Sequence, residues 1–391
     1  MSAVITHWSN AMPELSSRER VLTALNHEEP DRVPLDLGGH VTNIQTAPFN
    51  ALKTHLGKNW ETKNWVRDHV ESPEELLEML HIDTRYLRVK PASGFKLTIE
   101  PDNSFVDEWG VRWRKPQGTF YWNAVEPPLK NATIDDLDSY PWPDPSDPSR
   151  TEGLREKAKR MRAENKYAIV ADLPTLGPFE CAWAFFRGPD QFFMDLIMDK
   201  PFASALLNKL ADLHIALYRN FLDAVGEYAD IVMVADDLGA ENSPLMSLDT
   251  YRELLRPCHQ RIWSFIKQNT DARLFLHSCG SVVQFIPDLI EDGVDILNPV
   301  QVTAKGMDTK ILKQEFGDRL TFWGSIDTKL VMPSGSTQVV EDEVKRRIHD
   351  LAPGGGFVLA AVHNLQPGVP PQNICAMYDA GRKFGKYPIR I

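Results

Sequence analysis

The chain has 391 residues, of which 42% are hydrophobic and 25% are charged, and its formal net charge is -11. This is the composition of a globular protein that can bury a large core. Because binding to nucleic acid or to an anionic membrane surface needs clustered basic charge, the acidic balance argues against both kinds of partner.

Three features of the chain predict its compartment. No stretch approaches the run of about eighteen apolar residues that a transmembrane helix requires, so we expect no membrane span. Residues 1–20 lack the basic start and apolar run of a signal peptide. The four cysteines, Cys181, Cys258, Cys279 and Cys375, are too dispersed to form the disulfide framework of a small secreted domain. We therefore expect a cytoplasmic protein.

The N-terminal part combines a helical extension with two strand candidates. Ser16 and Glu19 have the spacing of a capping box ahead of an apolar run, which predicts a helix within an N-terminal extension over residues 1–30. Residues 32–39 (RVPLDLGG) and 81–91 (HIDTRYLRVKP) each predict a short strand.

Residues 104–129 differ in composition from the rest. They are rich in aromatic and β-branched residues, with glycines at turn positions, and predict an antiparallel β-hairpin insertion. The proline-rich residues 140–149 (YPWPDPSDPS) predict a linker.

After residue 165 the pattern alternates between short apolar strands and amphipathic helices, which indicates a parallel sheet covered by helices. Six such strands and two earlier ones make eight. We therefore expect an α/β fold, with residues 1–391 forming a single (β/α)8 TIM-type barrel domain. An open doubly wound sheet is the alternative, although no strand is followed by a GxGxxG or GxxxxGK(S/T) motif. The predicted strands cover residues 167–172, 230–236, 273–277, 294–299, 320–325 and 356–361.

Polar residues follow many of these strands. In α/β barrels the reactive groups lie at the C-terminal ends of the strands, so the set predicts the lining of a site. For any single aspartate, the alternative is that a strand end is simply where the chain meets water. The set comprises Asp36, Asp172, Asp236, Asp237, His277, Cys279, Asn298, Asp327 and His363.

His277, Cys279 and His363 form the sharpest candidate site. Residues two apart in an extended segment point to the same side, so His277 and Cys279 can converge on one ion. Both side chains are good Zn²⁺ ligands, and His363 lies just past the last predicted strand, beside the first in a closed barrel. Three protein ligands leave one position open, as in catalytic zinc sites. The alternative for the His-x-Cys pair is a capped strand end with a small buried cysteine.

The chain resembles the uroporphyrinogen-decarboxylase superfamily over nearly its full length. The resemblance implies the barrel but does not fix the reaction, because this superfamily contains both decarboxylases and methyltransferases. It rests on SRERVLTALNHEEPDRVPLDL, DEWGVRW, YPWPDP, LGPFE with FRG, ADDLG with SLDTYRELLRP, LFLHSCGSV, WGSIDT and HNLQPGVPPQNI.

Two comparisons separate those branches. Uroporphyrinogen decarboxylases carry an RQAGR segment whose arginines hold substrate propionates, and this chain has RVPLDLGGHVTNIQ in its place. The cobamide methyltransferases of the superfamily bind zinc through a His-x-Cys pair and a later cysteine. His277 and Cys279 match the pair, and His363 stands where that cysteine would be.

The resemblance and this departure predict a zinc-dependent methyltransferase. Replacing a thiolate by a neutral imidazole makes the zinc site more positive and a stronger Lewis acid, which suits the polarisation of an ether or hydroxyl oxygen. We expect methyl transfer from a small substrate, such as a methoxylated aromatic, to cob(I)alamin. Asp212 and His214 have the spacing of the corrinoid motif DxHxxG, but Leu217 replaces its glycine, so the cobalamin is expected on a separate corrinoid protein. Methylcobamide-dependent methylation of a thiol or other acceptor is an alternative.

Three carboxylates are candidates for assisting catalysis. Asp236 or Asp237 would orient a ligand histidine, since zinc-bound imidazoles usually donate their other N–H to a carboxylate. The alternative for this pair is N-capping of the following segment. Glu180 would be a fourth ligand displaced by substrate or a proton donor to the leaving oxygen.

The sequence is also consistent with two other functions. In a cofactor-free decarboxylase or lyase acting on a smaller carboxylic acid, Asp36 or Asp83 would protonate the carbanion and Arg85 or Arg88 would hold a carboxylate. In a non-catalytic binding module, the histidines would be remnants. A pocket lined by Trp109, Trp183, Phe185 and Trp323 would favour an aromatic substrate, and the alternative is that these four residues belong to the core. A homodimer is a candidate assembly.

Overall fold

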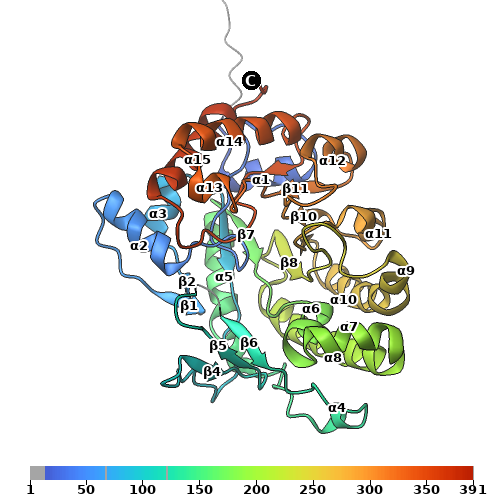
Figure 1. The fold of residues 1–391 in the computed structure, drawn as a ribbon. Helices are drawn as coiled ribbons and strands as arrows, with labels where there is room; N and C mark the ends of the chain where they lie inside the picture. The colour runs from blue at the N-terminus through green and yellow to red at the C-terminus, as the bar shows by residue number, and fades with distance from the viewer. Residues whose placement is uncertain (1–13, 67, 120–121, 391) are drawn as a thin grey trace, which may run out of the picture.

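A curled parallel β-sheet forms the centre of the protein (Figure 1). The structure is a computed structural model that describes residues 14–66, 68–119 and 122–390. Within these residues seven strands pair in parallel, and sheet order follows chain order. The strands are β3 (Thr84–Leu87), β7 (Ala168–Ala171), β8 (Ile231–Ala235), β9 (Arg273–His277), β10 (Ile296–Asn298), β11 (Thr321–Trp323) and β12 (Phe357–Val358).

All six strands predicted after residue 165 are present, although most are shorter than predicted. Almost every residue in them is buried, because helices cover the outer face of the sheet and side chains fill the inner one. Strands buried on both faces have continuous apolar sequences, and β8 (IVMVA) is an example. This is why their positions could be predicted without a period-2 pattern.

Helices connect successive strands and surround the sheet (Figure 1). In α14 (Thr337–Leu351) one face is apolar and fully buried, and it consists of Val340, Val344, Ile348 and Leu351. The helices are α1 (Ser17–Leu25), α2 (Thr46–His55), α3 (Glu74–Met79), α4 (Asp136–Ser139), α5 (Leu154–Glu164), α6 (Pro178–Glu180), α7 (Pro189–Met198), α8 (Lys200–Val225), α9 (Leu248–Thr250), α10 (Arg256–Asn269), α11 (Ile286–Glu291), α12 (Thr309–Phe316), α13 (Val331–Ser334), α14 (Thr337–Leu351) and α15 (Pro371–Phe384). None of the helices formed by the described residues combines the length and apolar character that crossing a bilayer demands.

Residues 32–39 join the two edges of the sheet without forming the predicted strand. The Asp36 amide donates to the Leu359 carbonyl (3.0 Å), and the Leu359 amide donates to the Pro34 carbonyl (2.9 Å). On the other side, the Asp83 amide donates to the Leu35 carbonyl (2.9 Å). Pro34 has no N–H and two glycines follow Leu37, so the segment makes isolated bridges in place of a ladder.

The predicted hairpin insertion contains a third strand. β4 (Ser104–Val106), β5 (Arg112–Arg114) and β6 (Asn123–Glu126) form an antiparallel sheet in the described part of the insertion, apart from the parallel sheet (Figure 1). A shorter antiparallel pair, β1 (Asn64–Val66) and β2 (His69–Val70), precedes β3. At the start of α1, the predicted capping box between Ser16 and Glu19 is present.

Candidate metal centre

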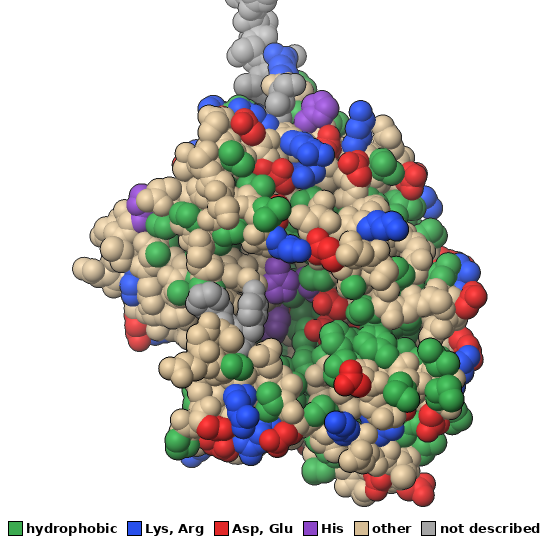
Figure 2. Space-filling model, viewed as in Figure 1, with side chains coloured by type: hydrophobic (Ala, Val, Ile, Leu, Met, Phe, Trp, Pro, Cys, Tyr) green, Lys and Arg blue, Asp and Glu red, His purple; other side chains and the backbone are tan. Residues whose placement is uncertain are grey.

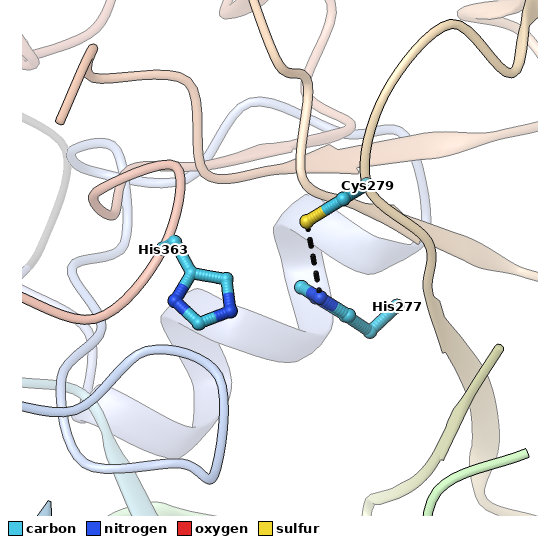
Figure 3. Close-up of side chains that lie close together, drawn as sticks. All are labelled: His277, Cys279 and His363. Carbon is cyan, nitrogen blue, oxygen red and sulfur yellow. Dashed lines mark hydrogen bonds between the residues drawn. The ribbon is translucent and has the colours of Figure 1, made fainter. Parts of the chain in front are cut away.

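The structure brings His277, Cys279 and His363 together at the C-terminal end of the sheet. His277 is the last residue of β9, Cys279 follows it by two residues, and His363 lies in the loop after β12. Their candidate ligand atoms all lie within 4.8 Å of one another, and Cys279 Sγ is 3.4 Å from His277 Nε2. Figure 3 shows the three side chains facing a common space, with one ring nitrogen of His363 turned toward the other two residues.

Burial sets the protonation of these groups. It lowers the pKa of His277 to about 4, although the hydrogen bond to Asn298 opposes this shift. Burial and the neighbouring His277 also lower the pKa of His363 to about 4. Both imidazoles are therefore neutral at neutral pH, which is the form that binds a metal ion. Burial raises the pKa of the Cys279 thiol well above its usual value, so thiolate formation there requires a nearby cation.

Asn298 fixes the tautomer of His277. The Asn298 side-chain amide donates to the Trp323 carbonyl (2.9 Å), so its oxygen faces His277 Nδ1 at 2.6 Å. An amide oxygen only accepts, and His277 therefore carries its proton on Nδ1 and directs the lone pair of Nε2 at Cys279. The sequence predicts Asn298 only as a strand-end residue of the site. Its contact with His277 follows from the β10–β9 register, in which Asn298 pairs with His277.

The loop that carries Cys279 is held by close backbone contacts. The Leu238 amide donates to the Ser278 hydroxyl (2.9 Å), and the Ser281 amide donates to the Ala240 carbonyl (2.8 Å). Gly280 has φ +85°, and a Cβ there would lie 2.3 Å from backbone atoms of Gly239. Glycine at position 280 therefore permits the close approach that places Cys279 above the sheet.

Asp236 and Asp237 face different directions. Asp237 Oδ1 accepts the Cys279 amide (2.8 Å) and lies 3.9 Å from His277 Nε2. Asp236 accepts the backbone amides of Phe179 (3.0 Å) and Glu180 (2.6 Å) and contacts His259 Nε2 at 2.9 Å. Asn298 therefore occupies the Nδ1 side of His277, and Asp236 anchors the start of α6. That Asp237 orients a ligand histidine stays a prediction.

Glu180 shares a cavity with His277 and His363, two of the three candidate metal ligands. The cavity has a volume of about 190 Å³, and its acidic lining includes Glu180, Asp237 and Asp68. In the face shown in Figure 2, histidine side chains lie in the central hollow, with acidic and hydrophobic side chains beside it. The remaining lining residues are His40, Val41, Gln45, His69, Trp122, Leu176, His277, His363, Asn364 and Gln366.

Most other strand-end aspartates have structural partners. Asp172 forms an ion pair with Arg88 (2.9 Å), and Asp36 is fully buried, where it accepts the Tyr86 hydroxyl (2.8 Å) and the Trp323 indole N–H (3.0 Å). Asp327 lies on a second cavity, of about 440 Å³, which Cys279 and His363 also line.

Asp83 and Arg85, which were expected to act in a decarboxylase, form ion pairs within the protein. Asp83 directly precedes β3, at the N-terminal ends of the strands, whereas His277 lies at their C-terminal ends. Asp83 forms ion pairs with Arg20 and Arg32. Arg85 pairs with Glu74 (2.6 Å). Neither Asp83 nor Arg85 lines the cavity that contains the two histidines of the site.

Comparison with known proteins identifies the family. The uroporphyrinogen decarboxylase (URO-D) family model matches residues 120–384. The chain belongs to the URO-D family. It is 26% identical over 285 residues to a uroporphyrinogen decarboxylase of Alkalilimnicola ehrlichii, covering 69% of this chain and 70% of that one. It is 25% identical over 178 residues to a methylated-thiol–coenzyme M methyltransferase of Methanosarcina mazei, covering 46% and 44% of the two chains.

A solved structure shares the fold of this URO-D family member. A methyltransferase from Methanosarcina mazei superposes with a TM-score of 0.63 at 21% identity, over 95% of this chain and 99% of that one. Similarity at this identity supports the fold. The similar proteins include decarboxylases and methyltransferases, and the choice between these reactions depends on the site.

Proposed function

We propose that this protein is a zinc-dependent methyltransferase. It would move a methyl group from a small substrate, such as a methoxylated aromatic, to cob(I)alamin on a separate corrinoid protein. The convergence of His277, Cys279 and His363 within 4.8 Å carries the proposal. One thiolate and two neutral imidazoles are a common donor set for Zn²⁺ and leave a coordination position open. Bound there, Zn²⁺ would act as a Lewis acid toward the oxygen from which the methyl group departs.

The residues around this site divide the remaining tasks. His277 Nε2, Cys279 Sγ and His363 would hold the ion, while Asn298 and Asp237 fix the positions of His277 and Cys279. In the transfer, the C–O bond would break as the methyl carbon accepted the electron pair of cob(I)alamin. The departing oxygen would keep the bonding pair and take a proton, for which Glu180 is the proposed donor because it lines the cavity of His277 and His363.

The curled parallel sheet supports the proposal that the chain folds as a barrel enzyme. We propose that the chain is one barrel domain over residues 1–391, with residues 32–39 at the eighth strand position. Residues 1–30 would be an N-terminal extension and residues 104–129 an insertion. The site then lies at the C-terminal ends of the strands, where barrel enzymes carry their reactive groups. A corrinoid protein would have to dock over this end of the sheet.

The function is tested by spectroscopy on the purified protein. With a corrinoid protein in the cob(I)alamin state, methoxylated and other methylated compounds are expected to produce methylcobalamin in proportion to the demethylated product. A reverse assay with methylcobalamin and thiols tests the thiol-methylating alternative. Release of CO2 from a carboxylic acid, without metal and without a corrinoid protein, would identify the decarboxylase function and reject the proposal.

Replacing Asn298 by leucine is expected to lower the affinity for zinc by about 10- to 100-fold, the usual cost of removing an outer-shell partner. The substitution removes the acceptor at His277 Nδ1, so the neutral ring can place its proton on Nε2. Competition with a chelator of known affinity measures the change. Asn373→Leu is the matched control, because Asn373 is also buried and donates to the Met332 and Gly335 carbonyls away from the site. Equal zinc affinity in the two variants would contradict the role of Asn298.

A further inference from the structure

A larger aromatic cavity adjoins the cavity at the metal centre. Its volume is about 330 Å³, within the range of about 300–1,000 Å³ that is typical of small-molecule sites. His40, His69 and Leu176 line both cavities, so the two cavities lie next to each other. The aromatic cavity therefore offers room for the rest of a substrate too large for the 190 Å³ cavity that His277 and His363 line.

The antiparallel sheet contributes one wall of this aromatic cavity. Phe105 of β4, Trp113 of β5 and the intervening Trp109 and Val111 all line it. The turn after β7 and the π-helical turn Cys181–Phe186 also line it, through residues that include Phe185. Trp113 and Phe185 pack against each other, with ring centroids 5.0 Å apart, so the antiparallel sheet contacts the π-helical turn beside the cavity.

Two of the four expected aromatic residues are thus cavity residues. Trp109 and Phe185 line the aromatic cavity as expected. Trp323 is fully buried in β11 and donates to Asp36, and Trp183 packs against Phe179 and Phe193, so neither lines the cavity.

The charged groups of the aromatic cavity are already compensated. Asp107 accepts the Trp109 and Val111 amides, both at 2.9 Å, and the Trp113 indole N–H at 2.7 Å. Glu108 forms an ion pair with Arg150 (2.8 Å).

The two basic residues that line the aromatic cavity also have partners. Arg88 pairs with Asp172 (2.9 Å) and stacks on Trp65, and Lys90 pairs with Glu152 (3.1 Å). A charged ligand at Arg88 would compete with the buried Asp172, whereas a neutral planar ring would contact mainly aromatic side chains.

We propose that the aromatic cavity binds the ring of a neutral methoxylated aromatic substrate, and that the antiparallel sheet selects for that ring. The inference rests on the proposed methyltransferase function and narrows its substrate class. The ring would lie against Trp109 and Phe185, which both line the cavity, and the methoxy group would point past His40 and His69 toward His277. The antiparallel sheet thereby becomes a specificity element, separate from the residues proposed to hold the metal ion.

Isothermal titration calorimetry of the purified protein tests this inference. Methoxyphenol, a neutral ring, is expected to bind, and dimethoxyethane, an aliphatic methyl ether, is expected to bind at least tenfold more weakly. Trp109→Ala is expected to weaken methoxyphenol binding by about tenfold, since an aromatic contact and its buried area are lost. Trp109→Phe keeps a ring and is expected to stay within about threefold of the parent protein.

Trp60→Ala is the matched control for these variants. Trp60 packs on Phe49, donates to Glu75 and lines neither cavity, so methoxyphenol binding is expected to be unchanged. Equal binding of the aromatic and aliphatic ethers, or equal loss in Trp109→Ala and Trp60→Ala, would overturn the inference. If methoxyphenol fails to bind while an aliphatic methyl donor still yields methylcobalamin, the aromatic site is wrong and the methyltransferase function stands. If methoxyphenol binds tightly but no methyl group is transferred, the methyltransferase function is wrong and the aromatic binding site stands.

Discussion

His277→Ala and Cys279→Ser are each expected to remove stoichiometric zinc from the purified protein and to abolish methyl transfer. Losing an outer-shell partner alone costs about 10- to 100-fold in metal affinity, so losing a ligand should cost more than 100-fold. All three protein ligands are needed, because a site with only two donors binds Zn²⁺ too weakly to retain it during dialysis. His363→Ala is expected to behave in the same way. Zinc per chain is measured by atomic emission, and methyl transfer by the change in the cob(I)alamin spectrum.

Two substitutions elsewhere in the chain control for changes of residue type. Cys375→Ser alters a half-buried thiol of α15, and His349→Ala alters a solvent-exposed imidazole of α14. Both proteins are expected to keep one zinc per chain and full activity. Circular dichroism and thermal unfolding establish that the site variants are folded. A folded Cys279→Ser protein that retains zinc and activity would remove the basis of the proposed function.

The metal centre illustrates what a pattern of residues can reveal. His277 and Cys279 were predictable because alternation along an extended chain places residues two apart on the same side. His363 followed from its place after the last strand, together with the expectation that the sheet curls until its edges approach. Both arguments use only chain geometry, and the structure brings the three side chains together.

The Asp236–Asp237 pair shows where this reasoning stops. Adjacent residues in an extended segment point to opposite sides, so only one of the two aspartates could face the site. Which one depends on the register between β8 and β9, in which Ala235 pairs with His277 and Asp237 therefore lies across from Cys279. A single-residue shift would exchange their roles. Register is a property of the folded sheet, and nothing local to the two aspartates specifies it.

Long-range packing limited the remaining predictions in the same way. The aromatic residues of 104–129 indicated an antiparallel insertion, but the third strand depends on pairing between β5 and β6 across a loop. Residues 32–39 had a strand-like sequence, and their isolated bridges follow from the positions of β3 and β12. Trp323 and Trp109 cannot be told apart by residue type. One is inside the sheet and the other faces a cavity because of the elements that carry them.

Asp83→Asn is expected to lower the free energy of unfolding by about 3–5 kcal/mol, the usual cost of removing one partner from a buried ion pair. Asp83 is fully buried and holds Arg20 (2.8 Å) and Arg32 (2.7 Å), and it also accepts the Leu35 amide at 2.8 Å. Asparagine preserves the shape but leaves two guanidinium groups facing a neutral side chain. Guanidinium chloride unfolding, followed by circular dichroism, measures the shift of the midpoint. Asp318→Asn, in an exposed pair with Arg319, is expected to leave the midpoint unchanged.

The same Asp83→Asn protein tests whether Asp83 is the proton donor of a decarboxylase. Asp83 lies at the N-terminal edge of the sheet, whereas His277, Cys279 and His363 lie at the C-terminal ends of the strands. Under conditions in which the variant is folded, its zinc content and methyl transfer should therefore equal those of the parent protein. If Asp83 were instead the proton donor of a decarboxylase, the variant would lose activity while keeping its stability. That pattern would reject the ion-pair role and favour the decarboxylase, because a buried carboxylate cannot be both a fixed partner of two arginines and a freely exchanging acid.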